Sequence, residues 1–137
     1  MHNLAEKSFL IFDDDPKTRD ILDIMLRQML QSRSVALRES SAQLDEQLSQ
    51  LNFVPDVVFL DVVIRPFDGY NILHKLLQTP LFHATKIVAV TAKVMPNDIE
   101  KMRQAGFHGL ISKPIIRQVF PELVQRILAG ESVWYIA

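Results

Sequence analysis

Short apolar runs alternate with longer amphipathic segments along this chain. Four of the runs are nearly free of polar residues and rich in β-branched or aromatic side chains, which is typical of strands buried on both faces of a parallel sheet. A fifth run is weaker. We therefore expect strands at residues 9–12, 34–39, 57–60, 86–90 and 109–112, of which the second is the weak one.

The segments after these runs carry apolar residues at steps of three and four, which predicts helices. Pro121 belongs in the first turn of a helix, so the last helix begins either at Arg117 or near Phe120. Strand and helix alternate five times, which predicts an α/β fold with a doubly wound, five-stranded parallel sheet. The expected helices lie at residues 16–31, 41–51, 70–78, 96–105 and 117–129.

The composition fits one globular domain. The 137 residues are 48% hydrophobic and 23% charged, which is enough apolar material for a core. With 15 basic and 16 acidic residues and no basic stripe, direct nucleic-acid binding has little electrostatic support. We find no cysteine, no signal-peptide pattern and no apolar run of the roughly 18 residues that a membrane span needs, so we expect a soluble cytoplasmic protein.

Four of the five expected strands end in a charged or hydroxyl-bearing residue. Asp13 and Asp14 follow the first strand, Asp61 follows the third, Thr91 follows the fourth and Lys113 follows the fifth. Each alone also fits a structural role, such as a helix cap or a turn. Because parallel strands end at one edge, where α/β sheets bind ligands, their joint placement favours a functional site.

Converging carboxylates repel one another unless a cation lies between them. Mg²⁺ suits oxygen ligands, whereas Zn²⁺ prefers His or Cys. Lys113 and the Thr91 hydroxyl add donors for phosphoryl oxygens. Asp61 stands alone on its strand and faces the acidic pair, so it is the expected nucleophile, and the expected product is an acyl phosphate.

Five short motifs follow one another in a fixed order, and together they resemble the receiver domains of two-component response regulators. The resemblance covers roughly residues 8–130 and implies a flavodoxin-like (βα)5 domain with strand order 2-1-3-4-5. It would follow an N-terminal extension at 1–7 and precede a tail at 131–137. The matching motifs are Phe9–Asp15, Pro55–Asp61, Asp68–Gly69, Val88–Ala92 and Ser112–Pro114.

The resemblance also implies roles for individual residues. Asp61 would accept a phosphoryl group from a histidine kinase, Thr91 would be the switch hydroxyl, and Lys113 would bind the phosphoryl group and precede a cis peptide bond. The implied Mg²⁺ ligands are Asp13, Asp14, Asp61 and the backbone carbonyl of Val63.

The partners implied are a sensor histidine kinase or phosphotransfer protein as donor and an unknown protein downstream. The surface of the fourth helix, fifth strand and fifth helix would carry the output, and a homodimer through it is a further expectation. The domain would be a signalling module whose only catalysis is its own phosphoryl transfer and hydrolysis. We expect the apolar tail to fold back on the domain, with a docking peptide or dimer contact as the alternative.

Three positions depart from the family pattern. Arg65 stands where a proline is usual and Pro66 comes one residue later, so we expect a reshaped loop. Leu110 replaces the aromatic residue that reports phosphorylation, which puts that route in doubt. Val63 and Lys93 occupy the positions that tune hydrolysis. Because an apolar Val63 cannot orient an attacking water, we expect a long-lived phosphoryl group.

Two other functions compete with this interpretation. One is a degenerate receiver that binds a partner without phosphorylation, for which Arg65 and Leu110 are the support. The other is a phosphatase of the haloacid dehalogenase type, with Asp13 as nucleophile and Asp15 as acid. That family needs a further acidic pair after its lysine, and Glu122 and Glu131 are isolated.

Overall fold

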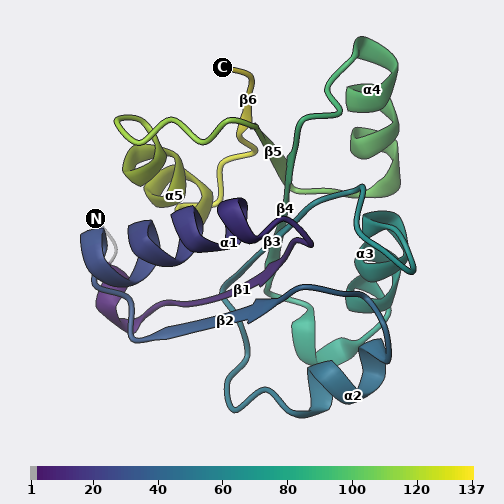
Figure 1. Cartoon of the computed structure of the whole chain (residues 1–137), viewed down its shortest axis with the longest axis horizontal. Helices are drawn as coiled ribbons and strands as arrows, with labels where there is room; N and C mark the ends of the chain where they lie inside the picture. The colour runs from purple at the N-terminus through teal and green to yellow at the C-terminus, as the bar shows by residue number, and fades with distance from the viewer. Residues whose placement is uncertain (1–2) are drawn as a thin grey trace.

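The computed structural model describes residues 3–137 and has the α/β architecture expected from the sequence (Figure 1). All neighbouring strands are parallel, and their order across the sheet is β2-β1-β3-β4-β5-β6. The five predicted strands and the order 2-1-3-4-5 are confirmed. A sixth, two-residue strand extends the sheet beyond β5. The strands are β1 (Ser8–Phe12), β2 (Ser34–Arg38), β3 (Val57–Leu60), β4 (Lys86–Thr91), β5 (Gly109–Ser112) and β6 (Trp134–Tyr135).

Five α-helices connect or follow the strands, close to the predicted positions. The first helix was expected to reach residue 31, but its α-helical part ends at Asp23 and a π-helical segment, η2 (Ile24–Met29), continues it. The second helix is shorter than expected because Gln43, just before it, has a left-handed backbone. The helices are α1 (Pro16–Asp23), α2 (Leu44–Ser49), α3 (Gly69–Leu77), α4 (Pro96–Ala105) and α5 (Phe120–Leu128), with 3-10 turns η1 (Leu4–Glu6) and η3 (Pro80–Phe82).

The helices cover both faces of the sheet. Figure 1 shows α1 and α5 on one side and α2, α3 and α4 on the other. Successive residues of each central strand point to opposite faces, so the sheet separates two apolar cores. On the α1/α5 side the Phe59 ring lies 6.1 Å from that of Phe9 and 5.7 Å from that of Phe120. These cores hold the strand ends, and hence the predicted site, on a rigid scaffold.

Both terminal segments of the described residues pack on the domain. Of the expected N-terminal extension, residues 1–2 lie outside the described residues, and Leu4 is buried. The tail forms β6 along β5, as the expectation of a folded-back tail requires. It therefore covers part of the surface on which we expected a homodimer. Within residues 3–137, no helix has the length and apolar character needed to cross a membrane.

Candidate phosphoacceptor site

The carboxyl edge of the sheet brings the predicted site residues together. The ladder continues past the strands, because the Asp13 N–H donates to the Arg38 carbonyl and the Asp61 N–H donates to the Phe12 carbonyl, each at 3.0 Å. The side chains of these two carboxylates are therefore fixed at the ends of β1 and β3. They are also shielded, since Asp13 is 1% and Asp61 7% exposed.

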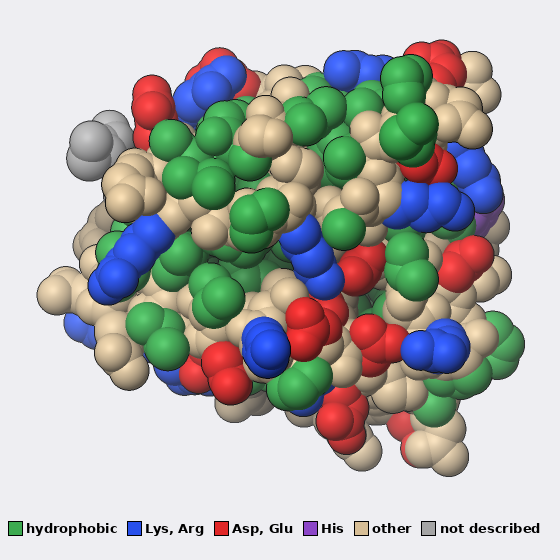
Figure 2. Space-filling model, turned by 45° about the horizontal axis from the view of Figure 1, so that its top comes forward, with side chains coloured by type: hydrophobic (Ala, Val, Ile, Leu, Met, Phe, Trp, Pro, Cys, Tyr) green, Lys and Arg blue, Asp and Glu red, His purple; other side chains and the backbone are tan. Residues whose placement is uncertain are grey.

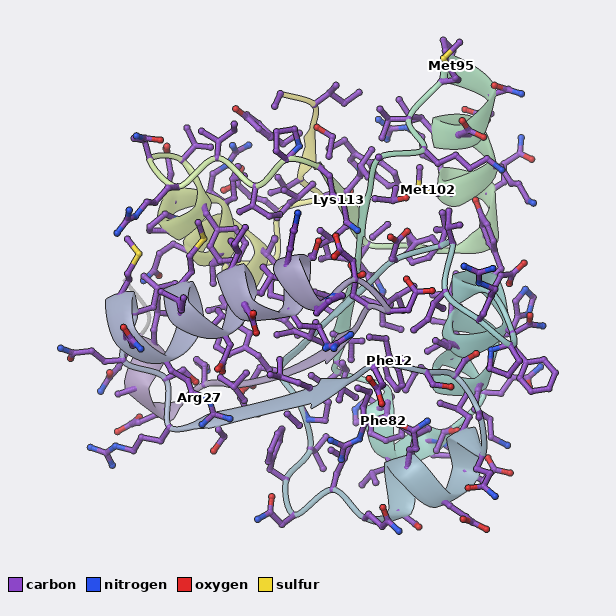
Figure 3. All side chains as sticks on the ribbon, in the orientation of Figure 1. Phe12, Arg27, Phe82, Met95, Met102 and Lys113 are labelled. Atoms are coloured by element: carbon purple, nitrogen blue, oxygen red, sulfur yellow. The ribbon has the colours of Figure 1, made fainter. Side chains whose placement is uncertain are left out.

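Lys113 joins these two carboxylates. Its Nζ lies 2.9 Å from Asp61 Oδ2 and 3.0 Å from Asp13 Oδ2, with 18% of the side chain exposed. Figure 3 labels Lys113 just beyond β5, near the start of α1. Its own N–H donates to the Thr91 carbonyl at 2.9 Å. The Lys113–Pro114 peptide bond is cis, as the resemblance implied.

The charges of this cluster are set by competition between burial and pairing. Burial raises the pKa of the Asp13 carboxyl, and the Asp15 N–H and Lys113 only partly oppose it. Burial alone would lower the pKa of Lys113, but its hydrogen bond to Asp61 and its close contacts with the charges of Asp61 and Asp13 outweigh that effect and raise it. The lysine is thus held as a cation between two acidic groups.

The remaining carboxylate oxygens show what the cluster is prepared to bind. Asp61 Oδ1 accepts the Val63 N–H at 3.0 Å, and Asp13 Oδ1 accepts the Asp15 N–H at 2.9 Å. Asp13 Oδ2 is buried and has the close Lys113 charge but no well-directed hydrogen bond. A buried, incompletely satisfied carboxylate oxygen is suited to a further cation.

Asp14, the third predicted carboxylate, lies apart from this pair. Its side chain is 36% exposed, and its Oδ2 lies 3.9 Å from Arg65 Nε. Within residues 3–137, no three acidic, histidine or cysteine groups are already arranged as metal ligands. The residue types fit Mg²⁺, although the described residues do not yet bring three such groups to one point.

Thr91 lies at the end of β4, beside Lys113, and is fully buried. Its Oγ1 accepts the Lys93 N–H at 3.2 Å. Because the oxygen takes that bond as an acceptor, the hydroxyl hydrogen can be donated to an oxygen placed in the site.

Asp15 is not available as a general acid. Its Oδ1 accepts the Lys17 N–H at 3.0 Å and its Oδ2 accepts the Thr18 hydroxyl at 3.1 Å, so it is the N-cap of α1. This arrangement disfavours the phosphatase that used Asp13 and Asp15 as a pair.

Sequence reasoning missed the contact that holds the loop after Asp61. The buried Ser41 hydroxyl donates to the Phe67 carbonyl at 2.6 Å and accepts the Phe67 N–H at 2.7 Å, while the Ser41 N–H donates to the Arg65 carbonyl at 3.1 Å. The Arg65–Pro66 bond in this loop is cis. A serine in a polar stretch gives no sequence signal for this role.

A groove runs from the site along α1, and we call it the α1 groove. One hollow of about 400 Å³ includes Lys113, and a second of about 390 Å³ continues it; Ile21 and Ile115 line both. The apolar face predicted for the first helix is thus only half covered, because Ile24 and Met29 are exposed here. Figure 2 shows hydrophobic side chains gathered on the face that also carries a group of acidic side chains.

The molecule is thus a flavodoxin-like α/β domain with a lysine between two buried aspartates at the carboxyl edge of its sheet. The chain belongs to the response regulator receiver domain family, whose sequence model matches residues 9–127. It is thus a signalling domain of two-component systems and not an enzyme in the usual sense.

Individual proteins and solved structures are also similar to this chain. An uncharacterized 14.6 kDa protein in the sodA1 3′ region of Leptolyngbya boryana is 28% identical over 92% of this chain and 93% of that protein. The signal transduction histidine-protein kinase BarA of Escherichia coli K12 is 29% identical over 88% of this chain, which spans only 13% of the kinase. The structure of a putative response regulator from Chloroflexus aurantiacus is 26% identical, with a TM-score of 0.77 over 90% of this chain and 99% of that one.

Proposed function

We propose that Asp61 is the phosphoacceptor of this receiver and that Lys113, Thr91 and a Mg²⁺ ion complete its site. The observation that carries the proposal is the position of Lys113 Nζ, 2.9 Å from Asp61 Oδ2 and 3.0 Å from Asp13 Oδ2, at the edge where a ligand can enter. A cation at that point neutralises the acceptor before transfer and the phosphoryl group after it.

The proposed transfer uses three groups of this chain, the Asp61 carboxylate, the Lys113 ammonium and the Thr91 hydroxyl. A carboxylate oxygen of Asp61 forms a bond to phosphorus as the phosphorus–nitrogen bond of a donor phosphohistidine breaks. The imidazole keeps the electron pair and takes up a proton. Negative charge then lies on the phosphoryl oxygens. Lys113, which contacts Asp61 Oδ2 before transfer, would pair with these oxygens, and the Thr91 hydroxyl would donate a hydrogen bond to one of them.

The metal would be held by oxygen ligands on three neighbouring segments. When bound, Mg²⁺ supplies charge neutralisation for the donor and acceptor oxygens. The buried Asp13 Oδ2 is the oxygen that most needs a further cation. The proposed ligands are Asp13, Asp14, Asp61 and the carbonyl of Val63.

The α1 groove suits the proposed donor, a histidine kinase or phosphotransfer protein. The groove is continuous with the hollow at Lys113, so a partner seated on its apolar wall would present a histidine at the acceptor. Exposed Ile21, Ile24 and Met29 would lose contact with water in that complex.

Intact mass spectrometry tests the assignment. The protein is incubated with a small phosphodonor with and without Mg²⁺, as wild type, Asp61→Asn, Asp13→Asn and the exposed control Asp20→Asn. We expect one added phosphoryl group that requires Mg²⁺ in wild type and Asp20→Asn, is lost in Asp61→Asn, and forms more slowly in Asp13→Asn.

Two outcomes would overturn the assignment. No gain in wild type would favour a binding module that acts without phosphorylation. Labelling that survives Asp61→Asn and disappears only in Asp13→Asn would place the nucleophile on β1 and revive the phosphatase.

A further inference from the structure

The tail is bound along the outer edge of β5 as a short strand. Val133 is 2% exposed, and its carbonyl accepts the Leu110 N–H at 2.7 Å. Trp134 lies under the Arg103 guanidinium, 4.1 Å from the ring centroid, and its indole N–H donates to the Ser132 hydroxyl. The tail thus occupies the edge with backbone pairing, a buried anchor and an aromatic contact, as an extended peptide does in strand addition. Figure 1 shows β6 beside β5, with the C-terminus beyond it.

Gly109 gives this edge a shape that accepts a strand. A Cβ at Gly109 would lie 2.5 Å from the Val133 carbonyl oxygen and 3.4 Å from its nitrogen, and the three atoms nearest to it all belong to Val133. The Gly109 backbone is one that any residue can adopt, so the glycine is needed only for the approach of the tail.

The bound tail is connected to the phosphoacceptor site through β5. The Ala137 N–H donates to the buried Ser112 hydroxyl at 2.8 Å, and Ser112 is followed by Lys113. Leu110, where the family has its reporting aromatic residue, donates its N–H to the tail. A movement of Lys113 toward a phosphoryl group would therefore act, through the four-residue strand β5, on the tail contacts of both Leu110 and Ser112.

The connection between α5 and the tail allows the tail to leave. Gly130 has a left-handed backbone, with φ of 93°, and no heavy atom lies within 4 Å of the position a Cβ would take. Only two residue pairs join β6 to β5. Such a short strand on an open hinge is suited to local release from the edge.

We propose that the outer edge of β5 is a strand-binding surface, that residues 131–137 occupy it within the same chain, and that phosphorylation weakens this contact and uncovers the edge. The occupant is the tail of the same chain, because its backbone pairing and its Val133 anchor fit the edge at Gly109. The phosphorylation step rests on the proposed function of Asp61, whereas the strand-binding surface itself does not.

The surface is tested with a fluorescent peptide of the sequence of residues 131–137 and the full chain. In wild type the tethered tail competes at an effective concentration on the order of mM, so peptide binding is weak. Val133→Asp, which puts a charge at the buried anchor, should release the tail and raise peptide affinity about tenfold or more, with Val133→Ala giving a smaller rise. Gly109→Ala should abolish binding alone and together with Val133→Asp, because it blocks the edge.

Circular dichroism shows whether each variant is folded. If Val133→Asp does not fold, the milder Val133→Ala still tests the proposal. Equal peptide affinity in wild type and a folded Val133 variant would overturn the proposal. Equal affinity with and without Gly109→Ala would do so as well, because the peptide would then bind elsewhere.

Trp134 is the single tryptophan of the chain, so its fluorescence reports the tail during phosphorylation. In a sample shown by mass to be phosphorylated, we expect stronger acrylamide quenching of Trp134. We expect unchanged quenching in Asp61→Asn treated in the same way.

The outcomes separate the two proposals. Absence of a mass gain refutes the phosphoacceptor assignment and the release that depends on it. A mass gain with unchanged quenching refutes the release of the tail alone.

Discussion

Replacing Lys113 by methionine should destabilise the protein strongly, because two buried carboxylates lose their shared cation. At an effective dielectric constant of about 20, each contact near 3 Å is worth roughly 6 kcal/mol before desolvation. Desolvation of the three charges and repulsion between Asp13 and Asp61 offset most of this. Removing one member of a buried pair typically costs about 3–5 kcal/mol, and since Lys113 is 18% exposed we take about 3 kcal/mol.

The assay is urea unfolding in Mg²⁺-free buffer, with a fall of about 10 °C in the melting temperature as the thermal counterpart. Lys75→Met is the matched control. Lys75 lies only 2.6 Å from Asp45, but the two side chains are 42% and 76% exposed, so its loss should cost less than about 1 kcal/mol. Mg²⁺ should then stabilise Lys113→Met more than wild type, because it meets two unpaired carboxylates. A Lys113→Met protein as stable as Lys75→Met, or one indifferent to Mg²⁺, would refute the reasoning.

Three further outcomes follow from individual contacts. Ser41→Ala should lower the free energy of unfolding by about 2 kcal/mol in urea, since both backbone groups of Phe67 lose their partner. Burial, with a smaller effect from Lys86, lowers the pKa of His108, whose Nδ1 accepts the Ile87 N–H. The contribution of neutral His108 to stability is therefore complete above about pH 6.5 and is lost as the pH falls below that value. Melting temperatures measured from pH 8 to 5 should show this loss. The phosphoryl group should persist for minutes or longer by intact mass, because the exposed Val63 cannot hold an attacking water, and Val63→Asn should shorten its life.

Each outcome has its own control. Ser49→Ala removes an exposed serine hydroxyl that donates to the Glu46 carbonyl, and it should hardly change the free energy of unfolding. A Ser41→Ala protein that loses no more stability than Ser49→Ala would count against the loop contact. His108→Gln should flatten the acid limb of the melting curve, and an unchanged limb would place the titrating group elsewhere. A wild-type half-life of seconds would contradict the argument from Val63.

The central part of the fold was predictable because its signals are local. The apolar run at 57–60 is buried on both faces, and the carboxylate after it lies at the expected edge. The ends of α1 and α2 were less predictable, because the wider turns of η2 and the left-handed Gln43 have no periodic signature. The two-residue β6 was not predictable, because it forms only where Gly109, which lies far away in sequence, has no side chain to block it. The residue pattern of the tail alone does not show that the two segments fit together.

The same division applies to the site. Residue type and strand position placed Asp13, Asp61, Thr91 and Lys113 together, since parallel strands of matched register must end side by side. Residue type and strand position did not predict where the Asp14 side chain points, because its direction depends on a flexible side chain and on the distant loop that carries Arg65. The strand ends are thus set by the sheet, whereas the loop contacts depend on interactions between distant segments.

Two departures from the family pattern, Arg65 and Leu110, lie at contacts of the loop and of the tail. Arg65 brings a second cation toward the acidic cluster, but its contact with Asp14 is 3.9 Å long and its side chain is 87% exposed, whereas Lys113 is close and shielded. An exposed pair of this kind contributes little, so Asp14 can turn to a divalent ion at small cost while Lys113 holds its place. Leu110 has lost the reporting ring, yet its backbone N–H holds the tail. In the proposed release, a change at the acidic cluster would therefore reach the tail through the backbone of β5.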